Sequence, residues 1–258
     1  MSKDGLIYGF TIDSEQNVQE LNYDDLKKLD KQLNKTNLTW LHFDYTNEKS
    51  IKWITENSTI HKVAIDALLI EDTRPRTTIL EDSILLTLRG INLNPNSLSE
   101  DMVSVRLYIS ENLIISTQRR SLLSIDDLAN SLRKNKTPIN ASEFIIYLTT
   151  KLISRIDDNM EDIEDKAIEI EEQSLDSSNM EFKTKMSSLK RELISLKKYL
   201  YPQKEAMKKL YYNNISWIKE YQKIQLREIN ERLILNIEEL ETSIEKLSLI
   251  QEEFRCRE

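Results

Sequence analysis

Residues 217–254 read WIKEYQKIQLREINERLILNIEELETSIEKLSLIQEEF, and this stretch decides the architecture that we expect for the chain. Its apolar residues recur every three or four positions, and their mean spacing of about 3.5 residues is the heptad spacing of helices that pack lengthwise. They are Leu226, Ile229, Leu233, Ile237, Leu240, Ile244, Leu247, Ile250 and Phe254. A continuous helix here would be about 57 Å long. Such a rod needs a partner, either another helix of this chain or a copy of itself.

Two further helical stretches precede this rod. Residues 145–170 and residues 182–200 each place their apolar side chains on one helical face. The polar segment 176–179 between them predicts an antiparallel hairpin, and Pro202 is expected to interrupt the second helix. The first helix is strongly acidic and the second strongly basic, so their charges favour pairing, while the apolar faces supply most of the stability.

The first half of the chain has a mixed pattern. Strands are predicted at 6–12, 40–45, 77–80, 84–91, 102–109 and 113–117, and helices at 23–33, 47–57, 60–70 and 124–135. The consecutive strands predict a central, mostly antiparallel sheet flanked by helices. Thr137-Pro138 punctuates the chain, so we expect an N-terminal α/β domain at 1–138 and a helical hairpin with a long stalk helix at 139–258. The predicted fold class is α+β.

Composition excludes several classes of function. The net charge of −8 argues against nucleic-acid binding, which needs a basic surface. The 3 glycines build no phosphate-binding loop, and the single cysteine builds neither an internal disulfide nor a Cys-rich zinc site. The chain opens without an apolar leader and contains no apolar run of the roughly 18 residues that span a bilayer. No nucleophile–base pair is evident, so we expect neither an enzyme nor a tightly bound cofactor.

Four sequence blocks carry a resemblance to a known family. They are TRPR at 73–76, LRGINLNP at 88–95, EDMVSVR at 100–106, and the segment that runs from LKREL at 189–193 to PQKEA at 202–206. Together they resemble the ZntB branch of the CorA superfamily of metal-ion transporters. The resemblance extends from about Trp40 to Phe254, and the order of the predicted elements also agrees with it.

The resemblance implies a homopentamer whose stalk helices form a funnel toward the cell inner membrane, with this portion in the cytoplasm. It implies transport of a divalent cation, with zinc as the expected cargo and proton coupling, and a CorA-type magnesium channel is the alternative. In this family the stalk continues into a first transmembrane helix, after which comes a Gly-Met-Asn signature. Because no helix stop follows Phe254, we expect the helix to continue past Glu258 into such membrane helices. A soluble helical scaffold that binds partners is the alternative from another class.

Acidic residues of the first long helix are the main candidate metal-ligating or metal-sensing residues. They lie off its apolar stripe, and oxygen ligands suit magnesium and also zinc. A solvated or helix-pairing face is the competing interpretation. The residues that we single out are Asp157, Asp158, Glu161, Asp162 and Asp165.

Smaller candidate sites lie elsewhere. His42 shares a strand face with Asp44 and would supply a nitrogen ligand for zinc, and Cys256 lies beside Glu252 and Glu253 near the end of the stalk. A hydrogen-bonded structural histidine and a free thiol are the competing interpretations. Four arginines within the resembling blocks would bind an anion, hold a subunit interface or form structural ion pairs, and they are Arg74, Arg76, Arg89 and Arg106.

Overall fold

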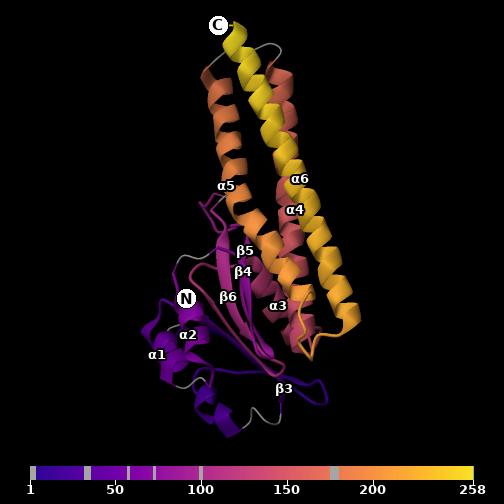
Figure 1. Cartoon of the computed structure of the whole chain (residues 1–258). Helices are drawn as coiled ribbons and strands as arrows, with labels where there is room; N and C mark the ends of the chain where they lie inside the picture. Colours follow the sequence, from indigo (N-terminus) through magenta and orange to yellow (C-terminus); the bar gives the residue numbers. More distant parts are fainter. Residues whose placement is uncertain are drawn as a thin grey trace.

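The computed structural model describes residues 4–31, 36–56, 59–71, 74–98, 101–174 and 180–257. In these residues a seven-stranded sheet occupies one end of the molecule, and three long helices extend from it (Figure 1). The strands are β1 (Leu6–Asp13), β2 (Val18–Glu20), β3 (Thr36–Asp44), β4 (Arg76–Leu80), β5 (Ser83–Gly90), β6 (Val103–Ile109) and β7 (Leu113–Gln118). The helices are α1 (Glu48–Glu56), α2 (Lys62–Leu69), α3 (Leu123–Arg133), α4 (Ala141–Ser174), α5 (Met180–Tyr211) and α6 (Glu220–Arg257), with a 3-10 helix η1 (Asp25–Lys31).

The sheet has the strand order β2-β1-β3-β7-β6-β5-β4. All neighbouring strands pair antiparallel except β3 and β7, which run parallel with Trp40 opposite Ile114. The prediction of a mostly antiparallel sheet is therefore confirmed. A parallel pair needs a long crossover connection, and here α1, α2 and strands β4 to β6 supply it.

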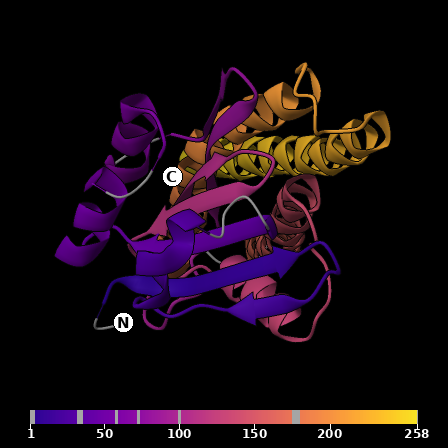
Figure 2. The same cartoon turned by 90° about the horizontal axis from the view of Figure 1, so that it is seen from below.

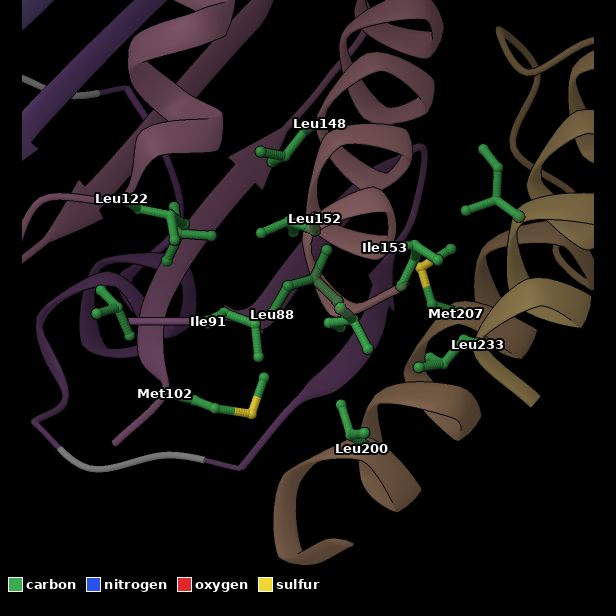
Figure 3. Close-up of a cluster of buried hydrophobic side chains, with 14 of the residues drawn as sticks. Leu88, Ile91, Met102, Leu122, Leu148, Leu152, Ile153, Leu200, Met207 and Leu233 are labelled. Atoms are coloured by element: carbon green, nitrogen blue, oxygen red, sulfur yellow. The ribbon is translucent and has the colours of Figure 1, made fainter. Parts of the chain in front are cut away.

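Helices cover both faces of the sheet (Figure 2). Successive strand residues point to opposite faces, so Trp40 joins the core under α3 and α4, whereas Leu41 packs with residues of α1 and α2. The first of these two cores continues without a break into the long helices. Figure 3 shows Leu88 and Met102 of the sheet region beside side chains of α4, α5 and α6. The division of the chain at residue 138 stays a prediction.

The three long helices form a bundle in which α5 runs opposite to α4 and α6 (Figure 1). The antiparallel relation of α4 to α5 agrees with the predicted hairpin, although its connection at 176–179 lies outside the described residues. The two hairpin helices contact each other less than each contacts α6. Their ion pairs follow the predicted charge pattern only in part: Lys185 of α5 lies 3.8 Å from Glu169, while Lys166 of α4 lies 3.6 Å from Glu192 of α5.

The heptad seam of α6 has its partners within the same chain. Leu226, Leu233, Leu240 and Leu247 are all at most 1% exposed, and they pack with apolar side chains of α4 and α5. At the C-terminal end, the ring of Phe254 lies 4.8 Å from the ring of Phe182 on α5. Of the two partners left open for the rod, this seam therefore has the helices of its own chain, and the assembly of five copies stays a prediction.

Two local predictions also need correction, and one strand was missed. Helix α5 continues through Pro202, because the residues on both sides of the proline are anchored in the core by Leu200 and Ala206. The proline removes a backbone donor but does not end a helix that is held by tertiary packing. The predicted helix at 23–33 is instead the 3-10 helix η1, and the short polar edge strand β2 was not predicted.

Candidate functional site

The acidic candidates of α4 divide between two surfaces. Asp158, Glu161, Asp162 and Asp165 are exposed, whereas the alternating positions of the apolar stripe are buried against the other helices. Their carboxylates therefore face solvent along α4. Exposed carboxylates attract cations over roughly the Debye length of 8–10 Å without holding them in a fixed geometry.

Asp157 has a different environment because it lies between α4 and α6. One carboxylate oxygen pairs with the guanidinium of Arg232, and the other accepts a hydrogen bond of 2.6 Å from Nδ2 of Asn236. Asn236 is buried, so this contact fixes α4 against α6. Asp157 is thus engaged in packing the bundle.

A cavity of about 210 Å³ lies between α4 and α6. Glu164, Glu171, Glu238 and Glu239 line it, together with Lys246 and several apolar side chains. Burial raises the pKa of Glu239, and the negative charges of Glu164, Asp157 and Glu161 add to this effect. Within the residues that the structure describes, no three His, Cys, Asp or Glu side chains are arranged to hold a metal ion. The geometry favours diffuse attraction of cations over chelation.

His42 is completely buried in the sheet. Its Nδ1 lies 2.7 Å from Oγ of Ser116, and that hydroxyl also accepts a hydrogen bond of 2.8 Å from Nε1 of Trp40. Burial lowers the pKa of His42 to about 4, while Gln118 and Asp44 act in the opposite direction. The ring is therefore neutral at physiological pH and forms part of the core.

Asp44 and Cys256 are the other two residues of the smaller candidate sites, and the structure shows the environment of each. Asp44 accepts hydrogen bonds from the backbone N–H and hydroxyl of Thr46 at 2.9 and 2.6 Å, so it stabilises the turn after β3. Cys256 is an exposed free thiol in the last turn of α6, next to the exposed carboxylates of Glu252 and Glu253. Neither environment gathers a set of ligands in the described part of the chain.

The four arginine candidates do not form one cluster. Arg74 and Arg76 are exposed at the start of β4. Arg89 is buried, donates a hydrogen bond of 2.8 Å to the carbonyl of Met102, and lies 4.1 Å from the ring of Tyr199.

Arg106 is also buried. It donates a hydrogen bond to the carbonyl of Glu71 and stacks 4.6 Å from the ring of Tyr45. Both buried arginines therefore contribute to packing through backbone carbonyls and tyrosine rings, and the predicted roles of the four arginines stay predictions.

The structure brings Arg89 together with two arginines that were not singled out from the sequence. Arg119 and Arg120, which follow β7, line a cavity of about 290 Å³ with Arg89. Two acids also line it: Glu71 lies 3.7 Å from Arg119, and Asp101 lies 3.5 Å from Arg120. Opposite charges compensate within this cavity. The adjacent arginines at the end of a predicted strand were the available signal.

Gln203 is another residue that sequence reasoning missed. Its amide oxygen accepts a hydrogen bond of 2.7 Å from the backbone N–H of Arg89, and its amide nitrogen donates one of 3.0 Å to the carbonyl of the same residue. The side chain is 1% exposed. Strand β4 pairs with β5 only as far as Thr87, so Gln203 continues the edge pairing where the strand has ended. It connects the helical bundle to the sheet.

Comparison with known proteins places these features in a family context. The family described as CorA-like Mg²⁺ transporter protein matches residues 35–257. The divalent cation transporter CmaX of Pseudomonas aeruginosa is 34% identical over 250 residues, which cover 96% of this chain and 75% of CmaX. The zinc transport protein ZntB of Yersinia enterocolitica is 29% identical over 247 residues, which cover 96% of this chain and 73% of that protein.

Solved structures agree with the fold. The structure of full-length CmaX matches with a TM-score of 0.90 and 32% identity, over all of this chain and 79% of that one. The ZntB cytoplasmic domain from Vibrio parahaemolyticus matches with a TM-score of 0.82 and 21% identity, over 98% of each chain, which supports the fold alone. Among the described residues of the present chain, no helix is both long and apolar enough to traverse a bilayer.

Proposed function

Because this chain belongs to the CorA family and is a CorA/ZntB-like transporter domain, we propose that it gathers divalent cations for transport across the inner membrane. Zinc is the proposed cargo, since several relatives are named zinc transport proteins. We further propose that the domain lies on the cytoplasmic side, that five copies form a funnel, and that it has no catalytic role.

The exposed acidic face of α4 is the observation that carries this proposal. Asp158, Asp162 and Asp165 follow one another at intervals of three or four residues, so their carboxylates share a face of the helix. A row of unchelated carboxylates raises the local concentration of cations and lets them leave again. A tight site would hold the ion, whereas a transported ion has to be released.

Transport by the complete gene product, reconstituted into lipid vesicles, tests the proposal. We expect Zn²⁺ uptake at low ionic strength, and we expect the Asp158→Asn, Asp162→Asn, Asp165→Asn variant to need a severalfold higher Zn²⁺ concentration for half-maximal uptake. The difference should shrink in about 0.5 M salt, where charges are screened within a few ångströms. A matched control changes exposed acids of the sheet domain: Glu15→Gln, Asp24→Asn and Glu111→Gln. Equal behaviour of the two triple variants would remove the role of α4.

Magnesium is the second candidate cargo, because the matching family is described by Mg²⁺ transport. Competition between the two ions decides between them. Uptake of zinc that a hundredfold excess of Mg²⁺ leaves unchanged supports zinc, and uptake of Mg²⁺ that zinc does not inhibit supports the magnesium alternative. Uptake of neither ion by a folded, inserted protein would contradict the transport proposal.

A further inference from the structure

Two surfaces of opposite charge lie on either side of α6. The acidic surface is the groove between α4 and α6, with Glu164, Glu238 and Glu239 around it. The basic surface lies on α5, where Lys190 and Arg191 line a shallow hollow together with other α5 residues. Lys198 follows Arg191 by two helical turns, so it extends the basic surface along the same face.

Hydrogen bonds to α6 show how the two surfaces are placed along the bundle. Nζ of Lys197 on α5 lies 3.0 Å from Glu241, and Nζ of Lys190 lies 3.1 Å from Oε1 of Gln251. Glu238 and Glu239 precede Glu241 by less than one turn of α6. The end of the basic surface at Lys198 therefore lies near the level of Glu238 and Glu239, and the part at Lys190 lies nearer the C-terminal end of α6.

Each surface also exposes large apolar side chains among its charges. Ile194 on α5 is 53% exposed within the basic surface, and Ile168 of α4 and Leu235 of α6 are 45% and 58% exposed at the acidic groove. Apolar side chains surrounded by charged ones are the arrangement of a protein–protein contact, in which the centre loses water and the polar rim stays hydrated.

We propose that the basic surface of α5 docks into the acidic α4–α6 groove of a second copy of this chain. Ile194 of one copy would lie against Ile168 and Leu235 of the next, while Arg191 and Lys198 would face the glutamates of the groove. The contact is heterologous, because the two surfaces differ, and repeating it generates a ring where the rotation between copies closes. This inference rests on the proposed assembly and specifies which faces meet in it.

The electrostatics of the groove favour the basic α5 surface of a second copy as its occupant. Partial burial raises the pKa of Glu239, and the negative charges of Glu164, Asp157 and Glu161 on α4 raise it further. A neighbouring cationic surface would relieve that repulsion. The overall charge of −8 would by itself oppose association, so a local match of opposite charges is what makes contact between copies favourable.

Charge reversal provides the test. The first variant, Arg191→Glu with Lys198→Glu, makes the α5 surface acidic, and the second, Glu238→Lys with Glu239→Lys, makes the groove basic. The purified chain is examined by sedimentation and light scattering over a range of concentrations. We expect each variant to associate at least about tenfold more weakly than the unchanged chain, because like charges then face one another. The chain that carries all four changes should recover association, since its two surfaces are complementary again.

Controls separate this effect from misfolding and from net charge. Lys52→Glu with Lys62→Glu makes the same change in net charge as the first variant at exposed positions of α1 and α2, and in 0.15 M salt its association should stay within about twofold of that of the unchanged chain. Circular dichroism and thermal unfolding verify that each variant is folded. An unchanged chain that stays monomeric at every concentration would overturn the proposal, and so would folded single-surface variants that associate normally.

The chain that carries all four charge reversals gives the sharpest outcome. If it is folded but remains monomeric while the unchanged chain associates, copies assemble through other faces and the proposed contact is wrong. Binding of the α5 surface to vesicles with anionic headgroups, with no association between copies, would assign it a lipid partner and also overturn the proposal. Zinc uptake by the complete gene product is measured separately, so failure of this contact is distinguishable from failure of the transport function.

Discussion

Replacing Gln203 by leucine should loosen the connection between the helical bundle and the sheet. The amide of Gln203 makes two hydrogen bonds, of 2.7 and 3.0 Å, with the backbone of Arg89 in β5. Leucine has a similar size but cannot accept or donate a hydrogen bond. The N–H and carbonyl of Arg89 would then remain buried without partners, because β4 no longer pairs with β5 beyond Thr87.

The expected loss of stability follows from the two unsatisfied backbone groups. Leaving a buried polar group unpaired costs about 1–3 kcal/mol, and the burial of the leucine side chain offsets part of the total. We therefore expect the free energy of unfolding to fall by about 2–4 kcal/mol, which is a large fraction of the 5–15 kcal/mol typical of a folded domain. Unfolding in urea, followed by tryptophan fluorescence and by circular dichroism, measures this difference.

A matched control is available two residues along the same helix. Glu205 is exposed, so Glu205→Leu should change the free energy of unfolding by no more than about 0.5 kcal/mol. Hydrogen exchange adds a local readout, because the Arg89 amide should lose protection in the Gln203 variant before the centre of the sheet does. A Gln203→Leu chain as stable as the control would refute the claim that this amide replaces the missing strand partner.

Three further predictions concern other buried or crowded positions. His42 has a folded-state pKa of about 4, below its ordinary 6.5, so stability should fall as the pH drops from 6.5 toward 4. At pH 4.5 this amounts to about 2–3 kcal/mol relative to pH 7, and His42→Gln should lack that part of the pH dependence in urea unfolding. Gly90→Ala should destabilise the fold by about 1–3 kcal/mol in the same assay, because the new methyl group would lie 2.7 Å from side-chain atoms of both Leu122 and Leu152. Glu239→Gln should raise the thermal midpoint at pH 8 more than at pH 4, because the pKa of Glu239 is raised and its ionisation at higher pH opposes folding.

Periodicity alone predicted most of the architecture, because local side-chain patterns determine it. The strands from β4 to β7 and the helices α1 to α4 all appear close to their predicted positions. Apolar residues with a period of two or of about 3.5 mark the face of a strand or helix that is buried. The fold buries these faces, so the pattern predicts the element. The ends of α5 and the course of the chain through Pro202 were less predictable, since tertiary packing decides whether a helix survives a proline.

The candidate sites were harder to predict, because pairing in space is absent from the sequence pattern. The acidic residues of α4 look alike in sequence, yet Asp157 pairs with Arg232 across the bundle while Asp158 faces solvent. Arg89 meets Arg119 and Arg120 only because the order of strands brings the ends of β5 and β7 near one cavity. Burial of His42 likewise depends on which helices cover β3.

The occupied seam of α6 constrains any contact between copies. The heptad residues that would form an apolar coiled coil are already covered by α4 and α5, so neighbouring copies have to use the remaining faces of the bundle. Those faces combine charges with separate apolar side chains such as Ile194, Leu235 and Leu249. Contacts of this kind depend on salt and on charge complementarity more than on apolar area, and truncating one charge changes them strongly. The sensitivity of association to salt is therefore the property in which this bundle should differ most from a coiled coil of stalk helices.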